Sequence, residues 1–310
     1  NPDTNLGVGS GTLASQTAAV MVAFEREIVA HRPDVVVVAG DVNSTVACAI
    51  VAAQHQIPVA HIEAGLRSGD WAMPEELNRV LTDRLSSWLF TTSSDADQNL
   101  RSEGIEEERI KCVGNTMIDS LYKSLPRARR MVPATLRELK IDTEFSLATL
   151  HRSSNVDDAQ TLSSILKELG RLSRHLRVLL PLHPRTAHSL KRHGIAVPRE
   201  IIACEALTYF EFIGIMERSS LVLTDSGGVQ EETSALGVPC LTLRETTERP
   251  VTCQRGTNRL IGADPSQILP AAFEALQKSH RPAQIPLWDG RAGMRVASIL
   301  ASDFLGCSQV

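Results

Sequence analysis

The sequence predicts an α/β protein built from doubly wound, Rossmann-like parallel sheets. Short apolar, β-branched runs alternate with helix-length segments along almost the whole chain. This alternation is typical of a parallel sheet with helices on both faces. A length of 310 residues with 43% apolar residues suits one large or two medium-sized domains. A segment without a strand in the middle of the chain favours two.

The first half of the chain carries four candidate strands. They are short runs dominated by β-branched, aromatic or other apolar residues, at residues 35–39 (VVVVA), 59–62 (VAHI), 88–91 (WLFT) and 110–113 (IKCV). Helix-length segments at residues 13–30, 44–54 and 74–87 lie between or before them. Pro74 suits the first position of the last of these helices.

The second half repeats the pattern with five candidate strands, at residues 147–150, 178–182, 201–203, 221–224 and 240–243. Helices are expected between them, including residues 159–175 and 228–236. Residues 121–142 hold a basic cluster and two prolines but no strand, so we place the domain linker there. We expect an N-terminal domain at residues 1–123 and a C-terminal domain at 124–289. A helix over Gly290–Phe304, within residues 290–310, should pack back on the first domain.

Composition excludes several classes of function. The net charge is −4 and the pI about 6.2, so no basic surface indicates nucleic-acid binding. No apolar run is long enough for membrane insertion, and no signal peptide is evident. The cysteines are scattered without a C-x-x-C pair and mostly in apolar surroundings, which suits reduced core thiols in a cytoplasmic protein. They are Cys48, Cys112, Cys204, Cys240, Cys253 and Cys307.

The most informative stretch is residues 221–250, LVLTDSGGVQEETSALGVPCLTLRETTERP. An apolar strand leads into Ser226-Gly227-Gly228 and then a helix. Paired glycines at a helix N-terminus let backbone N–H groups approach an anion, and the helix dipole favours negative charge there. With Glu232 further along and Arg249 beyond the next strand, the groups suit a diphosphate beside a hydroxyl-rich sugar. The alternative is an ordinary glycine-containing turn between strand and helix.

Polar residues also follow several of the expected strands, at the carboxyl ends where doubly wound folds bind ligands. Asp41 could instead cap the next helix, and His151 could be a structural histidine. Glu63 follows directly on an apolar strand, which indicates a functional role or an arginine partner. Glu75 follows Pro74, where the dipole favours the ionised form that a general base needs, although a first-turn glutamate is also routine. His61, two residues before Glu63, reads as a core or support residue.

Other site motifs are missing. There is no zinc-spaced His and Cys set, no H-E-x-x-H, no EF-hand loop and no P-loop. Residues 9–14, GSGTLA, formally match the dinucleotide fingerprint, but no buried strand precedes them, so we reject NAD binding there.

Five strings, in order along the chain, resemble the non-hydrolysing UDP-N-acetylglucosamine 2-epimerases. This resemblance implies a GT-B-type fold, in which two domains face each other across a cleft that holds the UDP-sugar. It also implies elimination of UDP to a 2-acetamidoglucal and re-addition on the other face, with no redox cofactor or metal, and a homodimer. The strings are residues 61–67 (HIEAGLR), 74–79 (PEELNR), 114–119 (GNTMID), 225–232 (DSGGVQEE) and 246–250 (TTERP).

The resemblance also assigns roles residue by residue. The catalytic carboxylates, whose individual roles stay open, and the cleft imidazole are Asp41, Glu63, Glu75 and His151. The residues that would hold UDP are Ser226, Gly227 and Gly228 (diphosphate), Glu232 (ribose hydroxyls), Arg249 (phosphates) and Phe212 (near the uracil, or else a core residue).

Two departures from the family pattern stand out. The Gly-Thr-Arg-Pro-Glu loop that follows the family's first strand has no counterpart, so we expect the first domain to lack its opening strand and helix. Ser10 lies near the position of an arginine that helps some members bind an activating second UDP-sugar, so that activation is not expected. Three alternatives therefore stay open: a hydrolysing epimerase, a UDP-binding but inactive truncated form, and a GT-B glycosyltransferase.

Overall fold

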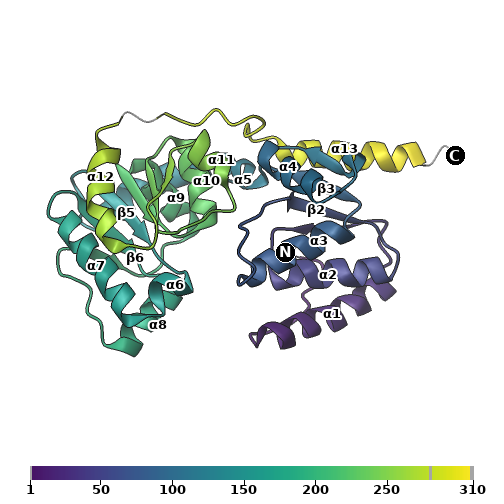
Figure 1. Cartoon of the computed structure of the whole chain (residues 1–310), viewed down its shortest axis with the longest axis horizontal. Coiled ribbons are helices and arrows are strands. Elements are labelled where there is room, and N and C mark those ends of the chain that lie inside the picture. The colour runs from purple at the N-terminus through teal and green to yellow at the C-terminus, as the bar shows by residue number, and fades with distance from the viewer. Residues whose placement is uncertain (1, 279–280, 308–310) are drawn as a thin grey trace. The chain divides into compact units, whose positions relative to one another are not determined.

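The computed structural model describes residues 2–278 and 281–307, with side chains of the last helix described as far as Asp303. The chain splits into two compact units. Unit 1 contains the described residues up to Thr116 and those from Pro286 onward, and unit 2 contains those of Met117–Ile285 (Figure 1). The expected division between residues 123 and 124 falls inside the helix that begins unit 2.

Unit 1 is built on a four-stranded parallel sheet with the order β1-β2-β3-β4. Val59 and His61 share one face of this sheet with Val36 and Val38, their register partners on β1. The strands are β1 (Val36–Ala39), β2 (Val59–Ala64), β3 (Trp88–Thr91) and β4 (Ile110–Cys112). The helices are α1 (Leu13–Ala30), α2 (Asn43–Gln54), α3 (Pro74–Leu85), α4 (Ser94–Ser102), η1 (Glu107–Arg109) and α13 (Ala292–Cys307).

Helices cover both faces of the sheet of unit 1. On one face, Val36 and Val38 pack with Ile28 of α1 and Ala49 of α2. On the other face, Val296 of α13 packs against Phe90. The last helix of the chain thus completes the core of the first unit, although residues 117–285 separate the two in sequence.

Unit 2 is built on a six-stranded sheet with the order β10-β9-β8-β5-β6-β7, and every neighbouring pair is parallel. The strands are β5 (Phe145–Thr149), β6 (Arg177–Pro181), β7 (Ile202–Cys204), β8 (Leu221–Thr224), β9 (Cys240–Thr242) and β10 (Asn258–Leu260). The helices are α5 (Thr116–Glu138), α6 (Ser153–Val156), α7 (Ala159–Ser173), α8 (Pro184–His193), α9 (Tyr209–Arg218), α10 (Gly227–Leu236), α11 (Pro250–Gln254), η2 (Pro265–Gln267) and α12 (Ile268–Leu276).

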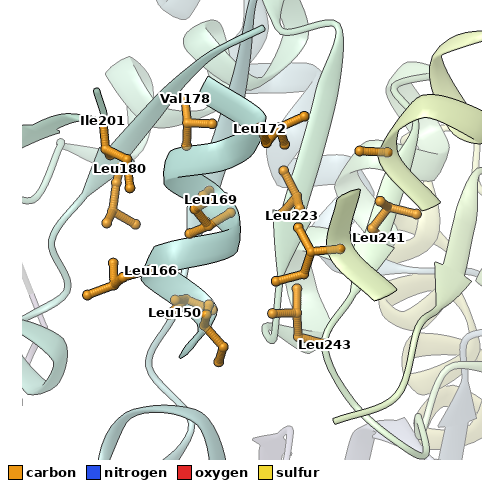
Figure 2. Packing of buried hydrophobic residues seen from close by; sticks show 14 of the residues in the cluster. Leu150, Leu166, Leu169, Leu172, Val178, Leu180, Ile201, Leu223, Leu241 and Leu243 are labelled. Carbon is orange, nitrogen blue, oxygen red and sulfur yellow. The ribbon is translucent and has the colours of Figure 1, made fainter. Parts of the chain in front are cut away.

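The core of unit 2 is a leucine-rich layer between α7 and the sheet (Figure 2). Leu162, Leu166, Leu169 and Leu172 recur at helical spacing, so one stripe of α7 is apolar and buried. They pack against strand residues such as Leu223. Burial of each leucine side chain contributes about 2 kcal/mol. This layer supports the strands at whose ends the polar residues lie.

The segment expected to be a linker is instead a single helix, α5, with Pro126 and Pro133 inside it. An interior proline removes a main-chain hydrogen bond and usually breaks a helix. Here a regular stripe that includes Ile118, Leu121 and Leu125 is buried along one side, and this packing offsets the two prolines. Tertiary burial therefore decided the structure of this segment against its local sequence.

All nine expected strands are present with ends within two residues of those predicted, and the α/β fold is confirmed. Strand β10 was missed because NRL at residues 258–260 is too short and polar to stand out. The expectation of core thiols is wrong for Cys112 and Cys253, which are exposed, whereas Cys240 is buried. Cys307 lies outside the described side chains. Among the described helices, none combines the length and apolar character needed to cross a membrane.

Candidate functional site

The glycine-rich turn of unit 2 lies where β8 ends. Asp225 follows the strand, and α10 begins at Gly227 with Ser226 as its N-cap residue. The Ser226 side chain does not cap the helix, so its hydroxyl is available to a ligand. The first N–H groups of a helix lack intrahelical acceptors, and the dipole places about half a positive charge there. Ser226, Gly227 and Gly228 therefore form a turn that suits an anion such as a diphosphate.

Gly227 lies directly against a buried ion-pair cluster. A Cβ at this position would come within 2.4 Å of Arg249 Nη1 and 2.6 Å of Glu248 Oε1. Arg249 Nη1 also forms a short ion pair with Glu248, and its Nε lies 3.1 Å from Glu231 Oε2. The arginine that the sequence assigned to the phosphates thus lies beside the anion turn, but two carboxylates already hold it.

Two further arginines converge on Glu248. Arg244 donates to Glu248 Oε2 at 2.8 Å, and Arg152 Nη2 lies 3.6 Å from Glu248 Oε1. Together with Arg249 and Glu231, these side chains bring three positive and two negative charges beneath the start of α10. The excess of positive charge among these five suits a polyanionic ligand.

His151 is held by Asp225, the residue that links β8 to the anion turn. Asp225 is fully buried, and its Oδ1 lies 2.9 Å from His151 Nδ1. The carboxylate also accepts hydrogen bonds from the main-chain N–H groups of His151 and Arg152 and from Asn155 Nδ2. Burial alone would raise the pKa of Asp225, but His151 and these donors lower it overall. Asp225 therefore stays ionised and directs the opposite ring nitrogen of His151, Nε2, away from itself.

A second histidine lies next to this pair. The ring of His183, the N-cap residue of α8, has its centroid 5.2 Å from that of His151. Burial and the charge of His151 lower the pKa of His183, so its neutral form is favoured.

Glu232, the predicted ribose ligand, is buried on α10 and accepts a 2.9 Å hydrogen bond from the Tyr209 hydroxyl. Burial raises the pKa of Glu232 to about 7, although the Tyr209 hydrogen bond acts in the opposite direction. Tyr209 begins α9, and a capping box between Thr208 and Glu211 fixes that helix start. Phe212 is half-buried one turn after Tyr209, on the same side of α9.

Asp41 lies at the end of β1 in unit 1. The N-cap residue of α2 is Val42, so the alternative in which Asp41 caps that helix is wrong. Its carboxylate instead forms a short ion pair with Arg79, while Asn78 donates to its carbonyl oxygen at 2.9 Å. About a quarter of the Asp41 side chain stays exposed (26%), which leaves it accessible to a ligand.

Glu63 adopts an unusual backbone conformation. Its φ is +69°, a left-handed value that glutamate rarely adopts, and the register of β2 against β3 shifts between Ile62 and Ala64. Such strain costs on the order of 1 kcal/mol or more and persists where the surrounding structure enforces it. The bulge gives Glu63 an orientation that a regular strand would not.

Glu75 and Asp41 line the same cavity of about 580 Å³ in unit 1, together with Asn43 and Asn78. Glu63 is not among the lining residues of this cavity. Pro74 occupies the first turn of α3 and places Glu75 at the helix start, half-buried. Two of the three predicted carboxylates thus share one pocket, whose walls contain both polar and aliphatic side chains.

The neighbouring glutamate, Glu76, has a different role. It is buried and accepts hydrogen bonds from Ser68 N–H and hydroxyl, Gly69 N–H and Arg79 Nη1, at 2.9 to 3.0 Å. Burial alone would raise the pKa of Glu76, but these donors and the Arg79 charge lower it. Glu76 therefore fixes the loop before α3 and positions Arg79, which in turn holds Asp41.

The structure thus brings some of the predicted residues together in each unit. In unit 2, Asp225 links His151 to the turn of Ser226, Gly227 and Gly228. In unit 1, Asp41 and Glu75 share a pocket. Sequence reasoning gave no site role to Arg79, which lies within the quoted string at residues 74–79, or to Tyr209, which lies outside all five strings. Asp225 lies within the string at residues 225–232, but its contact with His151 was not foreseen. Within residues 2–278 and 281–303, no group of three or more His, Cys, Asp or Glu side chains is arranged to hold a metal ion.

Comparison with known proteins finds relatives along almost the whole chain. Residues 1–301 match the family described as UDP-N-acetylglucosamine 2-epimerase. The UDP-N-acetylglucosamine 2-epimerase of Methanocaldococcus jannaschii is 41% identical over 308 residues, which are 97% of this chain and 84% of the relative. The UDP-2,3-diacetamido-2,3-dideoxy-D-glucuronate 2-epimerase of Pseudomonas aeruginosa is 40% identical over 305 residues, with 97% and 84% covered.

A solved structure gives the same result for the fold. The crystal structure of the M. jannaschii UDP-GlcNAc 2-epimerase in complex with UDP-GlcNAc and UDP has a TM-score of 0.90 to this chain at 40% identity. The match covers 97% of this chain and 85% of the other.

Proposed function

The chain belongs to the UDP-N-acetylglucosamine 2-epimerase family and acts on that sugar nucleotide or a related UDP-2-acetamido sugar, and we propose that it does so by eliminating and re-adding UDP. With UDP-N-acetylglucosamine the product is UDP-N-acetylmannosamine. The observation that carries this mechanism is that one chain contains both carboxylates suited to proton transfer and a site suited to a diphosphate. Unit 1 offers Asp41 and Glu75 in one pocket, and unit 2 offers an anion turn beside three arginines.

The proton on C2 of the sugar is not acidic, so its direct removal has a high barrier. A carboxylate of unit 1 removes this proton while the bond between C1 and the diphosphate oxygen breaks, which gives a 2-acetamidoglucal and UDP. A proton then returns to the other face of C2, and the diphosphate oxygen re-forms its bond to C1. The steps therefore need a base, an acid and a site that stabilises the departing diphosphate.

We assign each predicted residue one role in this reaction. Asp41, Glu63 and Glu75 together handle the two faces of C2. The main-chain N–H groups at Gly227 and Gly228, with Ser226, bind the departing diphosphate, and the buried arginine cluster adds positive charge.

The remaining assignments concern the nucleotide and the imidazole. Glu232 accepts hydrogen bonds from the ribose hydroxyls, and Phe212 lies near the uracil. His151, oriented by Asp225, faces the diphosphate with Nε2.

The test is incubation with UDP-N-acetylglucosamine in D₂O. The expected result is formation of the C2 epimer with deuterium at C2 in both epimers. Epimer without deuterium would rule out the elimination route. Free UDP with N-acetylmannosamine would identify a hydrolysing epimerase, and UDP binding without turnover would identify an inactive binding form.

The substituents at C3 and C6 of the sugar are a second question. The two relatives with different substrates are 41% and 40% identical to this chain, so identity does not separate them. Parallel assays with UDP-N-acetylglucosamine and UDP-2,3-diacetamido-2,3-dideoxyglucuronate would decide it by the ratio of kcat/KM. The homodimer and the cytoplasmic location stay predictions, and sedimentation of the purified chain tests the first.

A further inference from the structure

The imidazole of His61 is the most completely enclosed histidine side chain among the described residues, and it contacts two acceptors. It lies on β2, is 0% exposed, and faces the side of the sheet covered by α2 and α3. Its Nδ1 lies 2.6 Å from Asp83 Oδ1 on α3, and its Nε2 lies 2.9 Å from the carbonyl oxygen of Gly40. Neither contact is explained by the proposed reaction.

Both ring nitrogens of His61 must donate. A carbonyl oxygen only accepts, so Nε2 carries a proton toward Gly40. The Asp83 carboxylate accepts from Gly65 N–H at 3.1 Å and pairs with Arg67 at 2.7 Å through its other oxygen, so it is ionised and also only accepts. Burial alone would raise the pKa of Asp83, but His61 and Arg67 lower it. Nδ1 therefore carries a proton as well, and the ring is an imidazolium.

The charges around the ring balance. Asp83 lies between His61 and Arg67, and Arg67 also forms a two-nitrogen ion pair with Glu103 at 2.7 and 2.9 Å. Two cations and two carboxylates thus form one row, which runs from the buried His61 and Asp83 to the partly exposed Glu103. A buried charge is tolerated when it is paired and hydrogen-bonded in this way.

The position of His61 gives the ring its significance. Gly40 immediately precedes Asp41, and the carbonyl that His61 holds is the last one before that residue. Glu63 follows His61 by two residues at the bulge of the same strand. Asp83 lies on α3, the helix that begins with Pro74 and Glu75. The ring belongs to β2, which carries Glu63, and it contacts both the segment that carries Asp41 and the helix that carries Glu75.

We propose that His61 is a positioning residue, a doubly protonated imidazole that fixes the loop of Asp41, the bulge of Glu63 and helix α3 relative to one another. This role rests on the proposed epimerase function. His61 does not touch the sugar, because its ring is fully enclosed. It acts by holding the carboxylates where proton transfer at C2 requires them.

The first variant is His61→Gln, which cannot donate at both positions. We expect kcat to fall about a hundredfold, the loss typical when reacting groups shift by about an ångström. KM and the Kd of UDP should change by less than about threefold, because the nucleotide groups belong to unit 2. The matched control is His55→Gln, a partly exposed histidine at the end of α2 in the same unit.

The second variant, Asp83→Asn, keeps the hydrogen bonds while removing charge. The amide oxygen can accept from Gly65 and Arg67, and its NH₂ group can donate to an unprotonated Nδ1 of His61. The row then loses one negative and one positive charge and stays neutral. We expect this variant to keep kcat within about threefold of the unchanged protein, with a neutral His61 ring.

The decisive readout is ¹⁵N NMR of histidine-labelled protein, with the His61 signals assigned through His61→Gln. Both ring nitrogens of His61 should be protonated in the unchanged chain, whereas in Asp83→Asn only Nε2 should be. A singly protonated ring in the unchanged chain would overturn the proposal. So would a folded His61→Gln that keeps kcat, or one that loses UDP affinity in step with kcat. If the unchanged chain epimerises nothing, the proposed function fails, and the NMR result still decides the protonation of His61.

Discussion

Oδ1 of Asp225 lies 2.9 Å from Nδ1 of His151, and the same carboxylate accepts the main-chain N–H of that histidine. Side chain and backbone of His151 are therefore fixed by one buried group at the carboxyl edge of the unit 2 sheet. Asp225→Asn should keep the volume but lose the charge that holds Nδ1–H. We expect kcat to fall about a hundredfold.

The matched control for Asp225→Asn is His188→Gln, an exposed histidine on α8. Steady-state kinetics and UDP titration calorimetry give the two readouts. Unchanged kcat in a folded Asp225→Asn would show that His151 needs no orienting carboxylate. Because the pKa of Asp225 is lowered, its stabilising contribution is present above the unfolded value of about 3.9 and is lost as pH falls through the folded value.

Glu232 predicts a pH dependence of stability. Its pKa is raised to about 7 in the fold, against about 4.3 in an unfolded chain. Between these values the folded state binds one more proton, so the free energy of unfolding falls as pH rises through this window. The loss is about 3 to 4 kcal/mol. Glu232→Gln should remove it, which urea unfolding at about pH 5 and pH 8 would measure.

The same residue predicts a pH dependence of binding. If the ionised Glu232 accepts the ribose hydroxyls, UDP should bind more tightly as pH rises through about 7. Glu232→Gln should bind with little pH dependence. Tyr209→Phe removes the hydroxyl that lowers this pKa, so the midpoint should move upward. A flat binding profile in the unchanged chain would contradict the ribose assignment.

Glu75 and Glu76 form a matched pair on one helix. Glu75→Gln should reduce kcat by a factor of about a hundred or more while stability stays within about 0.5 kcal/mol, because the side chain faces a cavity. Glu76→Gln should destabilise by about 2 kcal/mol, because the amide cannot accept all of the donors from Ser68, Gly69 and Arg79. Thermal unfolding and kinetics on both variants check this. Equal losses of stability would show that Glu75 is structural.

Gly227 and Gly228 also differ in a testable way. An added Cβ at Gly227 meets the locked Arg249 and Glu248 side chains, whereas at Gly228 it meets the tip of Met117 at 2.7 Å, which can move aside. Gly227→Ala should therefore destabilise unit 2 by about 2 kcal/mol, and Gly228→Ala by clearly less. Urea unfolding of both variants measures the difference. A reversed order would mean that the ion-pair cluster is not rigid.

Sequence reasoning reached the strands and the residues at their carboxyl ends because both are local properties. A run such as residues 221–224 with Gly227 and Gly228 after it specifies a strand, a turn and a helix start within a few residues. Parallel strands of one sheet end at the same edge. Asp41 and His151 could therefore each be placed at the carboxyl edge of its own sheet without knowing their partners.

The partners were beyond reach because they are distant in sequence. Arg79 is 38 residues from Asp41, Tyr209 is 23 from Glu232, and Asp225 is 74 from His151. No periodicity relates such positions. The two prolines of α5 gave a misleading local signal for the same reason, since the burial that offsets them comes from other elements.

The α/β fold class, the family and the set of chemical groups could all be predicted before the structure, because strand and helix periodicity and contiguous motifs are properties of neighbouring residues. The folded arrangement was needed to distinguish the carboxylates that are accessible in a pocket from those that are buried in ion pairs. That outcome depends on desolvation and on charges brought together by folding, and neither is a property of any short stretch of chain.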